Sequence, residues 1–391
     1  MSTGPTFDVT LERLREVGGL KWSKHPDAIG AFVAEMDFGT APPVAKAMHT
    51  VIDEGLLGYL PDRLVARMAD AWSAWSRERY RWDVPAERVR PLSDVVSGLQ
   101  AAIEHFSSPG APVIVPTPAY MPFLFVPQEL GREVIEVPMA LDGGRYGYDL
   151  DALDAAYEAG ADLLVLCNPH NPTGRVLERD ELEAVARVVE RHGGRVFADE
   201  IHAPLVYDGH RHVPYASISD VTAGHTVTAT STSKAWNLPG TKCAQLVLSN
   251  DPDLTTWRDV GRRYEHGAST LGVVATVAAY ERGGPWLEQV LAHLDEHRRL
   301  FGDLLAEHLP EVGYTPPEGT YLAWLDCRRL GLGDHAADFF LEEAGVAVTD
   351  GPACGQAGAG FVRFTLATTR PLLEQAVRQM GEALRRRSTG G

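Results

Sequence analysis

The amino-acid sequence predicts an α/β fold in which helices cover a mostly parallel central sheet and a smaller α+β domain is attached. Between residues 43 and 280, short apolar runs alternate with helical patterns. Strands and helices in alternation are typical of a parallel sheet covered on both sides. The runs are continuously apolar, as strands buried on both faces are. They include residues 112–115, 162–167, 195–199 and 244–248.

Three segments are expected along the chain. Residues 1–42 are the N-terminal segment of the small domain, and residues 43–284 form the large domain with the alternating pattern. Residues 285–391 form the C-terminal part of the small domain. They begin with residues 286–309, whose apolar side chains repeat at helical spacing and predict a helix that bridges the domains. Two further strands are predicted near 320–325 and 361–366.

The charge of the chain excludes some classes of partner. Its 36 basic and 53 acidic side chains give a net charge of −17. This charge argues against nucleic acid or an anionic membrane as the main partner. No apolar run reaches the ~20 residues that cross a bilayer. The four cysteines form no CxxC pair and the N-terminus resembles no signal peptide, so we expect a cytoplasmic protein with reduced thiols.

A proline-rich turn follows the strand predicted to end at Cys167. It reads Asn-Pro-His-Asn-Pro-Thr-Gly over residues 168–174. Two prolines fix the backbone and prevent a strand or helix from continuing. Open α/β sheets bind ligands at the carboxyl ends of their strands. Asn171 offers an amide donor suited to a phenolate oxygen, although the turn could also be only a stiff connection.

Asp199 and His202 follow the next predicted strand, in Asp-Glu-Ile-His. A partly buried carboxylate needs a cationic partner, and a protonated pyridine nitrogen would serve. Keeping that nitrogen protonated makes the ring an electron sink. His202 could reach another edge of the same ring. The alternative is an Asp that caps a helix beside an incidental His.

A third segment could hold an anion. Gly98, Leu99 and Gln100 stand near the predicted start of a helix, where free N–H groups and the helix dipole favour a phosphate. Ser231 and Ser233 could add hydroxyl donors. A glycine at the start of a helix can also be purely structural. Lys242 could add positive charge.

Lys234 stands among small hydroxyl residues directly after an apolar run at 226–229. An amine there is poorly solvated, and desolvation disfavours its charged form. A Schiff-base lysine needs this property. Tyr120 follows another predicted strand and could stack on a planar ring. Together with the segments around Asn171 and Asp199, these groups are complementary to pyridoxal 5′-phosphate.

The motifs resemble a known family. Asn-Pro-x-Asn-Pro-x-Gly, Asp-Glu-Ile-His and Ser-x-Ser-Lys occur in the order and spacing of fold-type I, class I/II aminotransferase-like enzymes that depend on pyridoxal 5′-phosphate. The resemblance covers nearly the whole chain. Ala-Glu-Met-Asp-Phe at residues 34–38 and the position of His202 resemble more narrowly the MalY/PatB group of cystathionine β-lyases. Many transaminases carry Tyr at the position of His202.

The resemblance implies a role for each candidate residue. Lys234 would form the Schiff base with the cofactor and act as the catalytic base. Asp199 would pair with the pyridine nitrogen, and Asn171 would bond the ring hydroxyl. Tyr120 would stack on the ring. Arg363 would hold the substrate α-carboxylate, which suits its two-pronged guanidinium.

The resemblance also implies a phosphate site and a dimer. Gly98, Leu99 and Gln100 would hold the phosphate with Ser231 and Ser233. Tyr59 resembles the tyrosine that reaches the neighbouring subunit's phosphate site, which implies a homodimer with active sites at the interface. Relatives usually carry Arg where Lys242 stands. The single ammonium of a lysine thus replaces the planar guanidinium of an arginine, which can donate two parallel hydrogen bonds.

The implied reaction is the cleavage of an S-substituted L-cysteine, such as cystathionine, to a thiol, pyruvate and ammonia. An aminotransferase that passes the amino group to a 2-oxo acid is the alternative, because the same residues support both reactions. Phe38 and Tyr321, with Trp236 and His202, are the candidates that line the substrate pocket. They do not specify which amino acid is bound.

Two further patterns are not assigned to a ligand. His210 and His212 are spaced like metal ligands, but no third and fourth ligand accompany them, so no metal is expected. The glycine-rich residues 355–360 lack the strand and helix that surround a nucleotide-binding loop, and they predict a flexible loop before the strand of Arg363.

Overall fold

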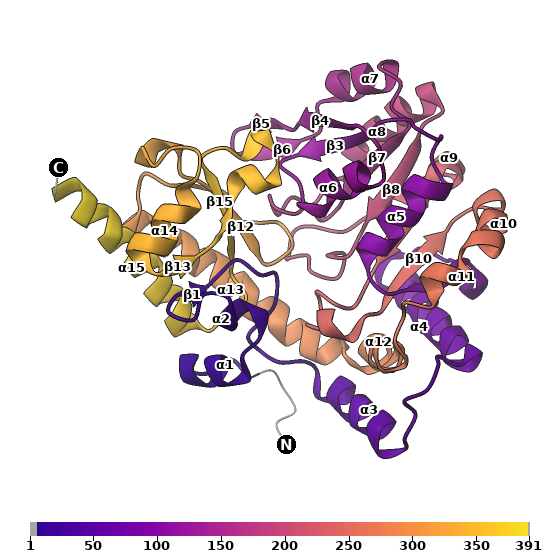
Figure 1. Cartoon of the computed structure of the whole chain (residues 1–391), viewed down its shortest axis with the longest axis horizontal. Helices are drawn as coiled ribbons and strands as arrows, with labels where there is room; N and C mark the ends of the chain where they lie inside the picture. The colour runs from indigo at the N-terminus through magenta and orange to yellow at the C-terminus, as the bar shows by residue number, and fades with distance from the viewer. Residues whose placement is uncertain (1–5, 390–391) are drawn as a thin grey trace.

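The computed structural model describes residues 6–389 and contains a large and a small sheet with their helices (Figure 1). The large sheet has seven strands in the order β2-β10-β9-β8-β7-β3-β4. Neighbours from β9 to β4 run parallel, whereas β10 is antiparallel to both β9 and β2. This confirms the predicted mostly parallel α/β fold. The strands are β2 (Val89–Leu92), β3 (Val113–Thr117), β4 (Val134–Pro138), β7 (Leu163–Cys167), β8 (Arg195–Asp199), β9 (Thr226–Thr230) and β10 (Ala244–Leu248).

The continuously apolar strands face two separate cores. In β7, Leu163 and Val165 point into one core, and Leu164 and Leu166 point into the other. Successive side chains of a strand point to opposite faces, so a strand covered on both sides must be apolar throughout. Helices α5 and α6 cover one face and α7 and α8 the other. Their bounds are Val95–His105, Pro122–Glu129, Leu150–Glu158 and Arg179–His192.

A third core lies among helices that pack on one another and on strands β2 and β10. It includes Met68, Trp72 and Val273, from α4 and α12. Helix α12 contacts both α4 and α3. The helices on this side of the protein are α3 (Pro42–Asp53), α4 (Asp62–Tyr80), α10 (Asp251–Val260), α11 (Arg262–Glu265) and α12 (Thr270–Arg282), and α9 (Asp220–His225) precedes β9.

The small sheet is antiparallel, with the order β11-β12-β15-β14. The N-terminal segment joins this part of the protein, because β1 pairs in parallel with β13. The strands are β1 (Ile29–Gly30), β11 (Gly313–Tyr314), β12 (Leu322–Asp326), β13 (Val346–Ala347), β14 (Thr349–Asp350) and β15 (Phe361–Thr365), and a separate hairpin has β5 (Ala140–Asp142) and β6 (Arg145–Gly147). The helices are α1 (Leu11–Val17), α2 (Leu20–Ser23), α14 (Ala336–Ala344) and α15 (Arg370–Thr389).

Helix α13 (Gly284–His308) connects the two parts (Figure 1). Its first half buries Trp286 and Val290 in the core of α4 and α12. Its second half buries Phe301 and Leu305 in the core of the small sheet. The boundary that we propose at residues 284–285 lies at the start of this helix. Within residues 6–389, no helix is both long and apolar enough to cross a membrane.

Candidate active site

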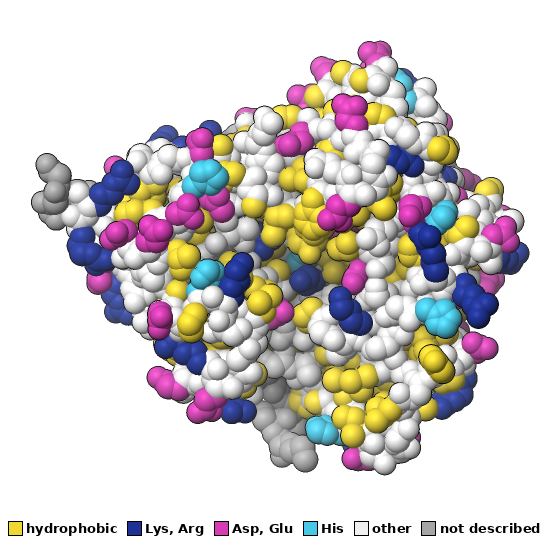
Figure 2. Space-filling model, viewed as in Figure 1, with side chains coloured by type: hydrophobic (Ala, Val, Ile, Leu, Met, Phe, Trp, Pro, Cys, Tyr) yellow, Lys and Arg dark blue, Asp and Glu magenta, His cyan; other side chains and the backbone are white. Residues whose placement is uncertain are grey.

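A cavity of about 250 Å³ lies at the carboxyl ends of the parallel strands. Cys167 ends β7 and Asp199 ends β8, and both line it. Ala34, from the N-terminal segment, also lines the cavity. The face drawn in Figure 2 is hollowed between the two parts of the protein. The candidate residues in its lining are Tyr120, Asn171, Asp199, His202, Ser231, Ser233, Lys234 and Lys242.

Lys234 donates a hydrogen bond from Nζ to the carbonyl oxygen of Ala34, at 3.0 Å. Burial lowers the pKa of Lys234 from 10.5 to about 8, and the nearby Arg363 guanidinium acts in the same direction. Glu35 and Asp199 partly oppose this effect. At pH 7 about a tenth of the amine is therefore uncharged, far more than for an ordinary lysine. The uncharged amine is the form that attacks a carbonyl carbon.

Asp199 is buried at the end of β8, where 3% of its surface is exposed. Its Oδ1 accepts the backbone N–H of Ile201 at 3.0 Å. Burial raises the pKa of Asp199 to about 7, although this hydrogen bond and the charge of Lys234 lower it. Among residues 6–389, no side chain forms an ion pair with it. A cationic ligand group beside Asp199 would remove the cost of keeping this carboxylate charged.

Arg363 joins the small sheet to the turn that carries Asn171. Its Nη1 donates to Asn171 Oδ1 at 3.1 Å. Its Nη2 donates to the carbonyl oxygen of Phe32 at 2.8 Å and to Thr349 Oγ1 at 3.1 Å. The guanidinium is buried, its pKa is lowered by that burial, and no described carboxylate pairs with it. The group is therefore suited to bind an anion, and the amide nitrogen of Asn171 remains available as a donor.

His202 and Tyr321 lie on the side of the cavity near Lys234. Burial holds the pKa of His202 well below its ordinary value, so the imidazole is neutral. Its Nδ1 is buried without a hydrogen-bond partner among the described residues. The ring of His202 meets that of Tyr321 edge-on, with centroids 5.9 Å apart. Tyr321 Oη donates to the Ala34 oxygen that also accepts from Lys234, at 2.8 Å.

Tyr120 lines the cavity from the loop after β3. Its ring packs edge-on against Phe123, with centroids 5.4 Å apart. Burial raises the pKa of its hydroxyl, and the charge of Asp199 raises it further. The phenol is therefore neutral, and a half-buried neutral ring is suited to stacking on a planar ligand.

The structure places the predicted anion cradle one helical turn away from the cavity. Gly98 lies inside α5, and a side chain there would come within 3.1 to 3.4 Å of Leu92, Ala229 and Phe197. Leu99 is fully buried in the core, and Gln100 follows it in the helix. The glycine thus permits the helix to pack closely on the sheet, and these three residues are not in the cavity lining.

The residues at the amino end of α5 line the cavity instead. They are Ser93, Asp94, Val95 and Val96. Asp94 is the N-cap of the helix and accepts the backbone N–H of Ser97 at 2.9 Å. Asp preceding an apolar helical run is an N-cap signal, and this signal could have located the helix start from the sequence.

The hydroxyl side chains near Lys234 and the Lys242 ammonium lie at the same end of the cavity. Ser231 Oγ donates to the carbonyl oxygen of Cys243 at 2.7 Å and accepts the backbone N–H of Ser233 at 3.0 Å. Lys242 Nζ lies 3.1 Å from Asp94 Oδ2. Free helix N–H groups, hydroxyls and an ammonium make this end of the cavity suitable for an anion.

Four other candidates lie outside the cavity lining. Arg363 and Tyr321 contact the lining residues Asn171 and His202, whereas Tyr59 and Phe38 lie elsewhere. Tyr59 is 95% exposed, in a separate groove that also contains Leu57 and His266. Phe38 is buried, with its ring edge-on to those of Phe7 and His293. His212 Nε2 lies 3.0 Å from Glu200 Oε2, so this imidazole is hydrogen-bonded to a buried carboxylate rather than available to a metal. Among residues 6–389, no group of three or more His, Cys, Asp or Glu side chains is arranged to hold a metal ion.

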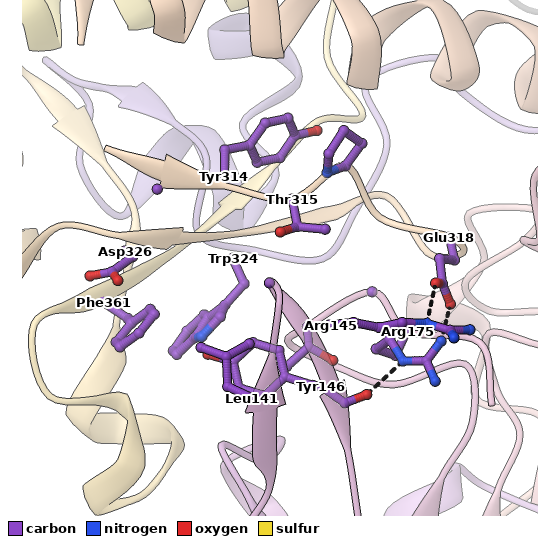
Figure 3. Close-up of a pocket in the computed structure, with 15 residues that line it drawn as sticks. Leu141, Arg145, Tyr146, Arg175, Tyr314, Thr315, Glu318, Trp324, Asp326 and Phe361 are labelled. Carbon is purple, nitrogen blue, oxygen red and sulfur yellow. Dashed lines mark hydrogen bonds and ion pairs between the residues drawn. The ribbon is translucent and has the colours of Figure 1, made fainter. Parts of the chain in front are cut away.

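A second cavity, of about 130 Å³, is lined in part by Arg175, which closely follows the turn of Asn171 in the chain (Figure 3). Aromatic side chains including Tyr146 and Trp324 form part of its wall. Figure 3 shows Glu318 directed toward Arg145 and Arg175, with which it forms ion pairs. Its charged side chains are thus already paired, unlike Lys234 and Asp199 of the first cavity.

Comparisons with known proteins agree with this architecture. The sequence model of the family “Aminotransferase class I and II” matches residues 30–380. A putative cystathionine beta-lyase of Mycobacterium tuberculosis is 40% identical, over 98% of this chain and 99% of that protein. Cystathionine beta-lyase PatB of Bacillus subtilis is 31% identical, over 97% of this chain and 99% of that protein.

A solved structure extends the similarity to three dimensions. The putative PLP-dependent beta-cystathionase of Corynebacterium diphtheriae has a TM-score of 0.92 and 37% identity, covering 98% of this chain and 99% of that one. The resemblance inferred from the three sequence motifs is confirmed. The chain belongs to the aminotransferase class I and II family.

Proposed function

We propose that the protein is a pyridoxal-phosphate-dependent carbon–sulfur β-lyase. It would convert an S-substituted L-cysteine and water to a thiol, pyruvate and ammonia. The observation that carries the proposal is that Lys234 and Asp199 line one cavity and that Arg363 is bonded to Asn171 in the same lining. None of the three charged groups forms an ion pair with a described residue, and burial disfavours the charge of each. Similarity to proteins described as cystathionine beta-lyases supports the reaction type.

The residues of the cavity fit the cofactor at both ends. Asp199 would hold the pyridine nitrogen in its protonated form, which would remove the cost of burying this carboxylate. Tyr120 would cover the ring, and Asn171 would donate its amide N–H to the ring oxygen. The N–H groups of Val95 and Val96, with Ser233 and Lys242, would bind the phosphate.

Pyridoxal 5′-phosphate, when bound, supplies an electron-withdrawing ring that stabilises negative charge at the substrate α-carbon. Arg363 would bind the substrate α-carboxylate with two parallel N–H donors and fix its orientation. Lys234 Nζ, uncharged in part at neutral pH, would accept the proton from the α-carbon. The thiolate would then leave from the β-carbon with the electron pair of the carbon–sulfur bond. The remaining three-carbon enamine would take up water to give pyruvate and ammonia.

The partner and the cellular location are also proposed. Tyr59 and Leu57 are highly exposed beside a groove, and Ile52 of α3 is exposed nearby. Figure 2 shows hydrophobic side chains gathered on the lower part of the face, over α3. We infer that a second copy of the chain covers this surface in a homodimer. All four cysteines are buried and unpaired, which supports a reducing, cytoplasmic location.

The test is incubation of the purified protein with L-cystathionine in the absence of any 2-oxo acid. Continuous release of pyruvate and thiol is expected. A single turnover that leaves the cofactor in its amine form would contradict the lyase and support the aminotransferase. Lys234→Ala, prepared in the same way, is the matched control and should release neither product.

A further inference from the structure

A carboxylate occupies the end of the cavity that would receive the cofactor phosphate. Asp94 lines the cavity beside Ser93 and Val95. Its Oδ1 accepts both the backbone N–H and the hydroxyl of Ser97, at 2.9 Å each. Its Oδ2 accepts from Lys242 Nζ at 3.1 Å. A helix N–H group and an ammonium, both suited to a phosphate, thus already bind an anion that belongs to the chain.

The charge of this carboxylate persists at neutral pH. Partial burial would raise the pKa of Asp94, but the Ser97 N–H and the Lys242 ammonium outweigh it and keep the pKa below its ordinary value. Apart from Lys234, Lys242 is the one cation among the described residues that line the cavity. A phosphate that enters must therefore share Lys242 with Asp94 or displace Asp94 from it. In either case the phosphate lies near the carboxylate of Asp94, which has the same sign of charge.

We propose that Asp94 is a built-in competitor of the cofactor phosphate. Its carboxylate holds Lys242 until a phosphate displaces it, so Asp94 lowers the affinity for ligands that carry a phosphate. Binding of the aldehyde at Lys234 is not affected, because that contact is at the other end of the ligand. The inference rests on the proposed function, since it assumes that pyridoxal 5′-phosphate is the ligand of this cavity.

A purely structural role for Asp94, as the N-cap of α5, would have a different consequence. Asn and Ser cap helices about as well as Asp, so Asp94→Asn and Asp94→Ser retain the cap and remove only the charge. The ion pair with Lys242 is largely exposed on both sides, and exposed pairs contribute little to stability. Both variants are therefore expected to fold, which a thermal melt would verify.

The experiment compares two ligands that differ only in the phosphate. The cofactor is removed from the full-length protein, which is then titrated with pyridoxal 5′-phosphate or with pyridoxal in phosphate-free buffer, and imine absorbance is recorded. A unit charge about 4 Å away in water changes affinity about fivefold. We expect Asp94→Asn and Asp94→Ser to bind pyridoxal 5′-phosphate at least about fivefold more tightly and to bind pyridoxal with unchanged affinity.

Each outcome decides between defined possibilities. Equal or weaker binding of pyridoxal 5′-phosphate by both variants would overturn the inference, as would an equal gain for pyridoxal. In those cases the proposed function would stand, because imine formation itself would have been observed. If the wild-type protein formed an imine with neither compound, the proposed function would fail and the inference with it. Inorganic phosphate, added as a competitor, should inhibit cofactor binding more strongly in Asp94→Asn than in the wild-type protein.

Discussion

At the residue scale, the cavity is distinguished by ionisable groups that are buried without a charged partner. Most ion pairs of this protein lie on or near its surface. Lys234, Asp199 and Arg363 are instead desolvated, and their pKa values move in the direction that disfavours charge. Keeping such groups in a folded protein costs free energy, and strongly perturbed groups cluster at functional sites. Each of the three therefore gives a separate prediction.

The first prediction concerns the nucleophilic amine. Only the neutral form of Lys234 attacks an aldehyde, and its pKa is lowered to about 8. Imine formation between cofactor-free protein and pyridoxal should therefore accelerate as the pH rises through about 8 and then level off. Stopped-flow absorbance from pH 6 to pH 10 measures the midpoint. A midpoint in the ordinary lysine range, near 10.5, would contradict the role assigned to burial.

The second prediction concerns the carboxylate that has no cation. The pKa of Asp199 is raised from 3.8 to about 7, so the folded cofactor-free protein binds more protons than the unfolded chain between these values. Its stability should fall as the pH rises through this window. Asp199→Asn should then stabilise the cofactor-free protein by about 2–4 kcal/mol at pH 8. The gain should shrink as the pH is lowered toward 4.

Chemical denaturation of both proteins at pH 8 and pH 5 provides the measurement for Asp199. A gain of equal size at the two pH values would show that charge is not its cause. With cofactor bound, the sign should reverse, because Asp199→Asn would then lose its partner on the pyridine ring.

The third prediction separates substrate binding from cofactor binding. Arg363→Lys retains the positive charge but loses the parallel donors. The KM for an S-substituted cysteine should rise on the order of tenfold to a hundredfold, while imine absorbance is retained. Arg370→Lys is the matched control, since Arg370 is exposed and pairs with Glu374. A loss of imine absorbance in Arg363→Lys would instead indicate a structural role.

At the scale of elements, the continuously apolar strands were the most predictable part of the fold. The runs at 112–115 and 162–167 correspond to β3 and β7, and those at 195–199 and 244–248 are β8 and β10. A strand that is buried on both faces has no solvent-exposed position for a polar residue, so its apolar run is uninterrupted. The edge strands β2 and β4 have weaker patterns because one side of each is not paired, and β4 is only partly buried.

The residues that the sequence motifs place at the ends of strands do come together in the structure. Asn171, Asp199 and Lys234 line one cavity, because parallel strands bring their carboxyl ends to the same edge of the sheet. Gly98, which was predicted to hold an anion, lies outside this lining, because it serves the packing of α5 on the sheet. The contact of Arg363 with Asn171 joins residues 192 positions apart, and no local pattern encodes it.

The fourth prediction concerns the segment that carries Ala34 to Lys234. A buried ion pair holds this segment, since Lys21 Nζ lies 2.8 Å from Asp37 Oδ2, and Trp22 Nε1 donates to Asp37 Oδ1 at 2.9 Å. Asp37→Asn leaves the buried ammonium of Lys21 unpaired. The protein should lose about 3–5 kcal/mol of stability, as measured by denaturant unfolding.

A double variant provides the control for Lys21 and Asp37. Lys21→Met with Asp37→Leu removes both charges and keeps an apolar volume, and it should recover much of the lost stability. If the single and the double variants were equally unstable, packing rather than the unpaired charge would be responsible.

At the scale of the whole molecule, the two sheets meet at the turn that carries Asn171. The backbone N–H groups of Glu318 and Gly319 both donate to the carbonyl oxygen of Gly174, at 2.8 and 2.9 Å. Arg175 follows in the chain, is buried, and pairs with both Glu181 and Glu318. Figure 3 shows the pair with Glu318. The segment that presents Asn171 to the cavity is thus held by the same contacts that dock the small sheet.

The fifth prediction tests this junction. Glu318 Oε2 accepts from Arg175 and from the backbone N–H of Val176, whereas its Oε1 faces the more exposed Arg145. Burial would raise the pKa of Glu318, but the Val176 N–H and the Arg175 charge lower it on balance. Glu318→Gln should destabilise the protein by about 1.5–3 kcal/mol at pH 7. Because the folded-state pKa is the lower one, this difference should be lost as the pH falls below about 4.5.

The matched control for Glu318 is Arg145→Gln, which removes the exposed partner of the same carboxylate. Exposed ion pairs contribute about 0–1 kcal/mol, so this variant should melt close to the wild-type protein. Thermal unfolding of the three proteins at pH 7 and pH 4 distinguishes the possibilities. If the two variants lost the same amount of stability, the buried bond to Arg175 would contribute no more than the exposed ion pair with Arg145. A larger effect of Glu318→Gln would show that docking of the small sheet depends on the buried bond to Arg175, the residue that follows the turn of Asn171.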